Sequence, residues 1–178
     1  MEYVVLVDEQ DRETGNMEKH QAHVEGKLHR AFSVFIFNTK GELLLQQRAS
    51  GKYHSANLWT NTCCSHPRPE EDIADAATRR LYEEMRLICK LEPSFSFLYK
   101  AVLDNGMTEH ELDHVFTGIT DAHPIPNEEE VSDWRYISMA QLEKEMSTHP
   151  EQFTEWLKLC FKDHYTQLTG KHENIHPA

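Results

Sequence analysis

The sequence predicts an α/β (α+β) domain, in which helices cover a mixed β-sheet that carries an extra terminal strand and helices. Three observations lead to this fold class. The chain has 178 residues, enough for one ordinary domain with its own hydrophobic core. Segments with strand-like and helix-like patterns are interleaved along it, and several strand-like segments are joined by short turns that favour hairpins. We therefore expect a single domain over residues 1–178.

The first third of the chain is expected to form mainly strands. Residues 3–7 are rich in β-branched and aromatic side chains and predict a strand, followed by a turn at residues 11–15. After a polar stretch, the sequence AFSVFIFNTKGELLLQQR contains two apolar runs joined at residues 38–41, which predicts a hairpin with a glycine in its turn. Residues 50–69 lack periodicity and predict a long loop, which in a compact domain is usually functional.

Residues 70–87 predict an amphipathic helix. Acidic residues concentrate in its first turn, where they complement the helix dipole. Apolar or small side chains recur at intervals of three and four, as one face of a helix requires. These side chains are Ile73, Ala74, Ala77, Leu81, Met85 and Ile88.

The last third of the chain is expected to add strands and two final helices. Residues 95–103 and 112–120 predict strands around the turn signal Asp104-Asn105-Gly106, with polar residues 108–111 leading into the second. Residues 134–137 predict a short strand. Two helices are expected at residues 139–146 and 150–168, the second starting at a proline.

The composition excludes several classes of function. With 39% hydrophobic residues and a net charge of -12, the chain has no basic stripe for nucleic acid, and no segment approaches the length of a membrane span. The four cysteines form no C-x-x-C pair, so a disulfide framework is not expected and a cytoplasmic location fits best. If the substrate is an anion, such a protein must gather its few cations locally and recruit a divalent metal.

The segment WTNTCCSHP, residues 59–67, lies in the long loop before the main helix. A thiol just before a helix amino terminus is favoured as thiolate by the dipole and the free N–H groups, so Cys64 is a candidate proton donor or acceptor. The alternative is that Cys63 and Cys64 are small buried fillers, since free cysteine is among the most buried residue types.

Histidine and carboxylate residues supply a candidate metal site. His66 follows Cys64 by two residues, and Glu109 and Glu111 alternate on a predicted strand, so their carboxylates point to the same side. His23 and His29 lie upstream in HVEGKLH, and such a ligand set suits divalent Zn, Mn or Fe. Taken singly, each histidine is more often a surface residue, so the argument for a metal site depends on the histidines acting together.

The basic residues allow two interpretations. Arg80 and Glu84 are four residues apart on the main helix, so they form either an exposed ion pair or part of a functional site. Arg48 and Lys52 lie where the hairpin gives way to the following loop. They form either a solvated basic cluster or a clamp for a diphosphate.

Four segments together resemble a known family. They are LHRAFSVFIFNTKGELLLQQR, LWTNTCCSHP, RRLYEEM and YKAVLDNGMTEHELDHVF. In this order the sequence resembles the type I isopentenyl-diphosphate Delta-isomerases of the Nudix superfamily over roughly residues 19–156. The resemblance implies a Nudix-like sheet, a catalytic region at about residues 19–160 and a place in isoprenoid biosynthesis. The Nudix hydrolase helix motif is altered at Ser65, Arg80 and Arg86, which disfavours pyrophosphate hydrolysis.

The resemblance also implies roles for individual residues. Cys64 and Glu111 would be the two proton carriers of a metal-dependent 1,3-proton shift, with Tyr99 hydrogen-bonded to Glu111. Glu84 would hold Mg²⁺ together with the substrate diphosphate. The implied site for one Mn²⁺ or Zn²⁺ consists of His23, His29, His66, Glu109 and Glu111. The implied substrate-binding residues are Lys19, Arg48, Lys52, Arg80 and Trp156.

Some assignments stay open at this point. Cys63 stands beside Cys64 and could replace it, and His20 competes with His23 as the upstream ligand. Trp156 either faces the developing cation in a cation–π contact or is simply a core residue of the last helix. We choose Cys64 because it precedes Ser-His-Pro, and His23 from its place before the LHRAF strand.

Two other functions compete with the isomerase. The first is a Nudix-type diphosphohydrolase acting on a nucleotide or related diphosphate, and the second is a non-enzymatic metal-binding or interaction domain. The hydrolase would use the residues of the helix motif that remain, Glu71, Arg79, Glu83 and Glu84. The preferred partner is a small allylic or homoallylic diphosphate, with no nucleic acid and no membrane, and the protein is expected to be a monomer or a weak homodimer.

Overall fold

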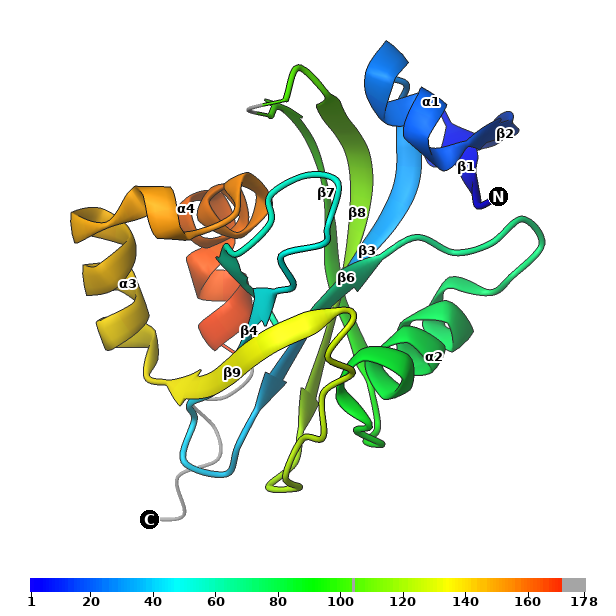
Figure 1. Ribbon diagram of the computed structural model, residues 1–178. Coiled ribbons are helices and arrows are strands. Elements are labelled where there is room, and N and C mark those ends of the chain that lie inside the picture. The colour runs from blue at the N-terminus through cyan, green and yellow to red at the C-terminus, as the bar shows by residue number, and fades with distance from the viewer. Residues whose placement is uncertain (104, 171–178) are drawn as a thin grey trace.

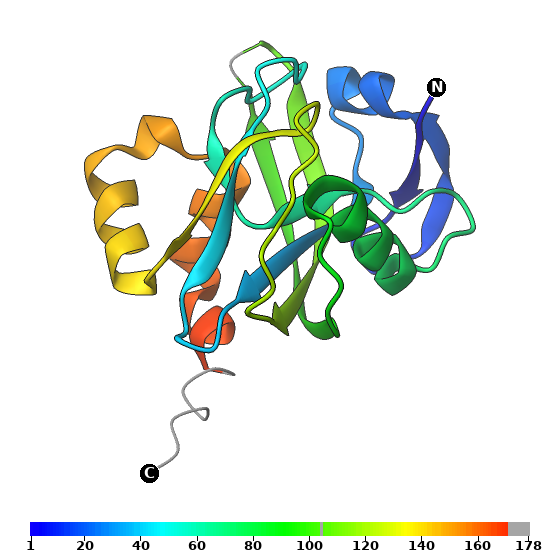
Figure 2. The same cartoon turned by 60° about the horizontal axis from the view of Figure 1, so that its bottom comes forward.

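The computed structural model describes residues 1–103 and 105–170. Within these residues the chain forms a nine-stranded mixed sheet between helices (Figures 1 and 2), so the predicted fold class is confirmed. The elements are β1 (Tyr3–Val7), β2 (Glu13–Glu18), α1 (Lys19–Glu25), β3 (His29–Phe37), β4 (Leu43–Arg48), β5 (Trp59–Thr60), β6 (Cys63–Ser65), α2 (Ile73–Met85), β7 (Glu92–Val102), β8 (Thr108–Ile119), β9 (Val131–Ile137), α3 (Met139–Thr148), the 3₁₀ turn η1 (Pro150–Gln152) and α4 (Glu155–Thr169).

Strand β3 is the centre of the sheet. It pairs in parallel with β8, where His29 lies opposite Glu111, and antiparallel with β6, where Ser33 lies opposite Cys64. Strand β8 also pairs antiparallel with β7, and Tyr99 lies opposite Glu111 in that pairing. Five of the residues expected at the site are thus carried by four adjacent strands: His29, Cys64, Tyr99, Glu109 and Glu111.

Two hydrophobic cores lie on opposite faces of the sheet. Alternate side chains of β3 point to opposite faces, so Phe32, Val34 and Ile36 pack against α2, whereas Phe35 and Phe37 pack against α3 and α4. Figures 1 and 2 show α2 on one side of the sheet and α3 and α4 on the other. This double burial explains why residues 31–37 of β3 are apolar except for Ser33, rather than alternating between apolar and polar.

Helix α2 is shorter than the predicted range of residues 70–87. The side chain of Asp72 accepts hydrogen bonds from the first free backbone N–H groups, and Arg86 ends the helix in the left-handed conformation with φ 53°. Leu81 and Met85 are buried as expected, but Ile88 lies beyond the end and is 76% exposed. The cap, rather than the apolar spacing, decides where the helix stops.

The amino-terminal region differs most from the sequence prediction. Strand β2 occupies part of the predicted turn at residues 11–15, and α1 follows it in the stretch expected to be irregular. Strand β2 is polar and largely exposed because it pairs only with β1 at one edge of the sheet. Helix α1 has no strong apolar face, and its ends are set by the cap residues Glu18 and Gly26. Neither element therefore leaves a hydrophobic pattern in the sequence.

The remaining differences concern boundaries. The loop at residues 50–69 contains the short strands β5 and β6, polar residues 108–111 belong to β8, and β9 begins earlier than residue 134. The last helix begins at Glu155, because Pro150 opens a separate 3₁₀ turn. In the predicted turn at residues 104–106, Asp104 lies outside the described residues, and Gly106 has φ 78° as such a turn requires. None of the described helices is long and apolar enough to cross a membrane.

Candidate active site

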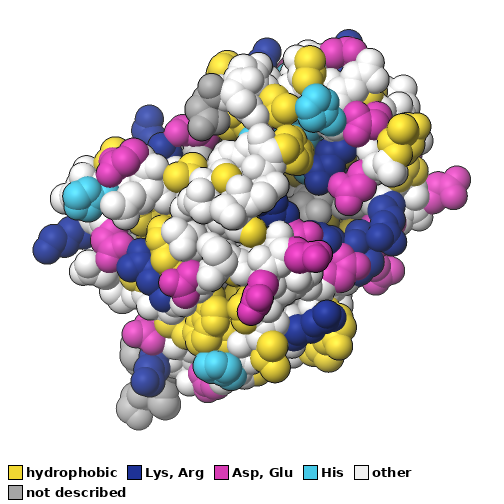
Figure 3. Space-filling model, viewed as in Figure 1, with side chains coloured by type: hydrophobic (Ala, Val, Ile, Leu, Met, Phe, Trp, Pro, Cys, Tyr) yellow, Lys and Arg dark blue, Asp and Glu magenta, His cyan; other side chains and the backbone are white. Residues whose placement is uncertain are grey.

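Most of the predicted site residues line one pocket. Of the thirteen, all but His23 and His29 are in its lining, and these two are fully buried. Figure 3 shows basic and acidic side chains intermixed on this face of the molecule rather than separated into patches of one sign. The predicted residues that line the pocket are Lys19, Arg48, Lys52, Cys64, His66, Arg80, Glu84, Tyr99, Glu109, Glu111 and Trp156.

Three imidazoles surround one carboxylate oxygen. Glu111 Oε1 lies 3.0 Å from His66 Nε2, 3.3 Å from His29 Nε2 and 3.9 Å from His23 Nε2. His20, the competing upstream histidine, is exposed, so the geometry favours His23. Four ligand atoms on His23, His29, His66 and Glu111 lie within 4.8 Å of one another, close enough to hold one ion.

The orientation of two of these rings suits a divalent cation. His23 Nδ1 lies 2.7 Å from the carbonyl of Lys19, and His29 Nδ1 lies 2.8 Å from that of Lys27. A carbonyl only accepts, so both Nδ1 atoms carry the proton and both Nε2 atoms direct a lone pair toward Glu111. His23 Nε2 is buried without a hydrogen-bond partner, which is the state expected of a ligand atom that faces an ion. The residues therefore fit a divalent metal.

Glu109 belongs to a second, overlapping group. Its ligand atom lies within 4.8 Å of those on His23 and His54, and all three residues are buried. His54 was missed in the sequence, where it is one of twelve histidines and lies in a loop without periodicity. The five predicted ligands thus fall into two groups that share His23, rather than into one.

The two glutamates of β8 have opposite protonation tendencies. Both accept hydrogen bonds from the Tyr99 hydroxyl, over 2.6 Å to Glu111 and 3.1 Å to Glu109, so the predicted contact of Tyr99 is present. Burial opposes ionisation of Glu111, but the close approach of His29 and His66 to its carboxylate holds its pKa well below the usual range. Burial and the charge of Glu111 raise the pKa of Glu109. The pKa values of these two neighbouring carboxyl groups are therefore shifted in opposite directions.

Cys64 lies on the other wall of the pocket. Cys63 and Cys64 are adjacent on β6 and point to opposite faces of the sheet: Cys63 joins the core under α2, whereas Cys64 packs with Tyr99 and Trp156. The prediction that a helix terminus favours the thiolate is wrong, because Cys64 is in a strand and α2 begins only at Ile73. Burial instead raises the pKa of Cys64 to about 12, so the resting group is a thiol.

A network of neutral hydrogen bonds holds the thiol. Cys64 donates to Asn61 Oδ1 over 2.9 Å and accepts from the indole N–H of Trp156 over 3.0 Å. The Asn61 amide donates to the carbonyls of Val34 and Cys63, which fixes its orientation. Asn61 was not predicted, because its role depends on contacts that the local sequence pattern does not reveal.

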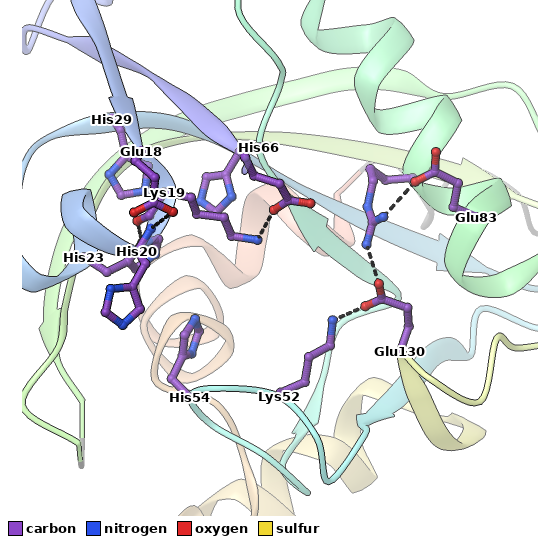
Figure 4. A network of polar contacts seen from close by, with 12 residues as sticks. Glu18, Lys19, His20, His23, His29, Lys52, His54, His66, Glu83 and Glu130 are labelled. Carbon is purple, nitrogen blue, oxygen red and sulfur yellow. Dashed lines mark hydrogen bonds and ion pairs between the residues drawn. The ribbon is translucent and has the colours of Figure 1, made fainter.

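The expected cations gather at the pocket, and all of them except Arg48 have an acidic partner. Arg80 donates to Glu84 over 2.6 Å, and Glu84 also accepts from Gln46 over 2.8 Å. Glu84 is only 4% exposed, so the alternative of an exposed ion pair is wrong. The Arg48 guanidinium lies 5.2 Å from the centre of the Trp156 ring and donates to backbone carbonyls of the following loop. Figure 4 shows the pairs at the mouth of the pocket, among them Lys52 with Glu130.

Asp113 is a further buried carboxyl group of β8. Ser33 donates a hydrogen bond to its Oδ2 over 2.7 Å, while Oδ1 is buried without a partner. Burial and the nearby charge of Glu111 raise the pKa of Asp113 to about 8. Its position two residues after Glu111, on the same face of the strand, was the available signal in the sequence.

Comparison with known proteins gives a consistent result. Residues 27–157 match the family model described as NUDIX domain. The chain is 57% identical over 158 residues to the isopentenyl-diphosphate Delta-isomerase of Pectobacterium atrosepticum, covering 89% of this chain and 88% of that protein. It is 52% identical over 157 residues to isopentenyl-diphosphate Delta-isomerase 1 of Aromatoleum aromaticum, covering 88% and 89%.

Solved structures support the same fold. A crystal structure of a Deinococcus radiodurans protein superposes with a TM-score of 0.75 at 18% identity, covering 92% of this chain and 99% of that one. The MutT protein of Methanosarcina mazei superposes with a TM-score of 0.60 at 16% identity, covering 83% and 94%. At these identities the likeness concerns the fold alone.

Proposed function

The chain belongs to the Nudix-domain family of isopentenyl-diphosphate Delta-isomerases, and we propose that it interconverts isopentenyl and dimethylallyl diphosphate. The observation that carries the proposal is a single pocket lined by Cys64 and Glu111 and adjoining a group of three histidines and a carboxylate. A thiol and a carboxylate can each give and take a proton, which is what a reversible double-bond shift needs.

The reaction adds a proton to one carbon and removes another two carbons away, through a tertiary cation-like centre. We assign the two proton transfers to Cys64 and Glu111, each serving as donor in one direction and acceptor in the other. Tyr99 would hold Glu111 in place, since its hydroxyl already donates to that carboxylate. Trp156, which is 4% exposed, would help to exclude water that could trap the cation.

We propose that His23, His29, His66 and Glu111 hold one Mn²⁺ or Zn²⁺. Bound there, the ion would orient Glu111 and tune its proton affinity. Glu109 would lie beside this ion, in the group that it forms with His23 and His54. Its contact with the Tyr99 hydroxyl links it to Glu111.

The substrate diphosphate would bind at the mouth of the pocket. We propose that Lys19, Arg48, Lys52 and Arg80 contact it, and that Glu84 holds Mg²⁺ against its oxygens. These cations would offset locally the net charge of -12 that repels an anion. We further propose a cytoplasmic protein, monomeric or weakly dimeric, that contributes to isoprenoid biosynthesis.

The hydrolase alternative is less well supported. Of the helix-motif residues it would use, Arg79 is bound to Glu71 over 2.7 Å and to Glu83 over 3.2 Å. These acids are engaged in ion pairs on the outside of the pocket, and neither lines it.

An activity assay tests the proposal directly. Purified protein with Mg²⁺ should convert isopentenyl diphosphate to dimethylallyl diphosphate and release neither phosphate nor a nucleoside monophosphate from nucleotides. Removal of the metal by a chelator should abolish the activity, and return of Mn²⁺ or Zn²⁺ should restore it. Nucleotide hydrolysis without isomerisation would show that the chain is a hydrolase instead.

A further inference from the structure

A second groove adjoins the active pocket and shares its cations. We call it the vestibule and define it by Glu2, Lys19, Lys52, Arg68, Arg80 and Glu130. Lys19, Lys52 and Arg80 line both the vestibule and the active pocket. A diphosphate bound by these three cations would therefore lie where the two spaces meet.

Each shared cation is paired with an acid in the vestibule or the pocket. Lys19 Nζ lies 2.9 Å from Glu2, whose side chain is 74% exposed. Glu130 differs from Glu2 because it contacts two cations: one carboxylate oxygen pairs with Lys52, and the other lies 3.4 Å from Arg80 Nη2. Figure 4 shows Glu130 beside Lys52 in this arrangement.

The position of Glu130 is fixed by its backbone. Its carbonyl accepts from Ala49 N–H over 3.0 Å, and its own N–H donates to the carbonyl of Asn127 over 2.9 Å. Ala49 in turn accepts from the N–H of Lys52, so the loop that carries Lys52 is tied to the segment that carries Glu130. The Glu130 side chain is 24% exposed, which is little for a surface acid. The contact with Lys52 is thus built into the fold.

A carboxylate that bridges a lysine and an arginine resembles a phosphate group in charge and in acceptor oxygens. We propose that Glu130 is a positioning residue that stands in for the terminal phosphate of the substrate, holding Lys52 and Arg80 until the Mg²⁺-diphosphate displaces it. This inference rests on the proposed function for the identity of the substrate. Glu130 then competes with the diphosphate for Lys52 and Arg80. This competition allows bound substrate and product to leave the site.

Competition between Glu130 and the diphosphate predicts the direction in which the affinity for the diphosphate changes when Glu130 is altered. If Glu130 loses its charge, Lys52 and Arg80 are free for the diphosphate and the local potential becomes more positive, so the diphosphate binds more tightly. A residue that bound Mg²⁺ or held the fold would have the opposite effect, since its loss would weaken binding. The direction of the change therefore separates the proposal from these alternatives.

The test is calorimetric binding of inorganic pyrophosphate, with Mg²⁺, to the metal-loaded protein. Glu130→Gln is expected to lower the Kd about fivefold, as the removal of one charge near the bound anion implies. Glu145→Gln is the matched control, because Glu145 pairs with Arg135 over 2.6 Å outside the lining of both grooves, and it should leave the Kd unchanged. An unchanged or raised Kd in Glu130→Gln overturns the proposal, and Glu130→Ala carries the same expectation if the glutamine variant does not fold.

A double-mutant cycle with Lys52→Gln identifies the route of the effect. In the Lys52→Gln background, Glu130→Gln should change the Kd much less than in the wild type, because one of its two partners is gone. An equal change in both backgrounds overturns the assignment. Isomerase kinetics keep this result separate from the proposed function: a fall in the KM of Glu130→Gln supports the stand-in role, whereas an inactive wild type with a tighter-binding variant rejects only the isomerase.

Discussion

The two walls of the active pocket are built from different chemistry. The wall on β8 and β7 gathers Glu109, Glu111 and Tyr99 with three imidazoles, so its groups influence one another through charge. The wall on β6 holds Cys64 between the Asn61 amide and the Trp156 indole, which are neutral. One proposed proton carrier is therefore surrounded by charged groups and candidate metal ligands, and the other is held by fixed hydrogen bonds.

This difference means that the two walls should fail differently when altered. A change in the charged wall spreads to every group that shares its field, including the proposed metal ligands. A change in the neutral wall stays local, since dipoles act over shorter distances than charges.

Glu111→Gln should disable the charged wall in two ways at once. It removes a proton carrier and the only carboxylate of the group with His23, His29 and His66, so we expect kcat to fall by about 10⁴-fold. Bound Mn²⁺ or Zn²⁺, measured by elemental analysis after dialysis, should fall as well. Full metal content together with full activity would show that Glu111 has neither role.

Cys64→Ala should disable the neutral wall alone. We expect kcat to fall by about 10³-fold while the metal content stays at the wild-type level, because the hydrogen-bond partners of the thiol, Asn61 and Trp156, are not among the candidate metal ligands. Cys63→Ala is the matched control: Cys63 faces the opposite core, so its loss should cost about 1 kcal/mol of stability and leave the kinetics intact. If the two variants behaved in the same way, the assignment of the thiol would be wrong.

The contrast between the walls also explains what the sequence could predict. The charged wall depends on Glu109 and Glu111, whose alternation on one strand is visible locally, and on histidines within a recognisable order of motifs. The neutral wall depends on contacts between distant parts of the chain. Thr154 donates a hydrogen bond to Thr60, from which it is 94 residues away in the sequence, and Thr60 donates to Asn61. Single polar residues of this kind have no periodicity, so pattern analysis does not find them.

The elements of the fold likewise divide into those that the sequence pattern predicts and those that it does not. Elements with a strong apolar signal, such as the apolar run of β3 and the periodic apolar face of α2, lie close to their predicted positions. Strand β2 and helix α1 were not, because they bury little and are fixed by pairing and by the caps Glu18 and Gly26. His23 lies on that unpredicted helix, so its candidacy as a metal ligand rested on residue type and on its place before the LHRAF strand, and not on a predicted structure.

Trp156→Phe should distinguish the two contacts that this residue makes. Phenylalanine keeps an aromatic face for a cation but removes the indole N–H that donates to Cys64 over 3.0 Å. If the hydrogen bond matters, kcat should fall by about tenfold with little change in KM. Steady-state kinetics measure this split, and Trp156→Phe with wild-type kcat would leave only the ring face as functional.

Asp113→Asn should have the smallest effect on activity but a clear effect on the pH dependence of stability. Burial and the charge of Glu111 raise the pKa of Asp113 to about 8, above its ordinary value of 3.8. A folded pKa above the unfolded one means that stability from this group is complete below the unfolded pKa and is lost as the pH rises toward the folded pKa. The wild type should therefore lose stability from this source between those two values.

Asparagine is neutral throughout and has nearly the same shape, so the variant avoids this loss. The free energy of unfolding of the metal-free protein, measured in urea, should shift in favour of Asp113→Asn as the pH rises from about 5 to about 9. The comparison uses the difference between the two proteins, because other groups titrate equally in both. A difference that stayed constant over this range would mean that Asp113 is ionised throughout. In that case the charged wall would extend along β8 from Glu111 to Asp113, the residue that accepts the hydrogen bond from Ser33.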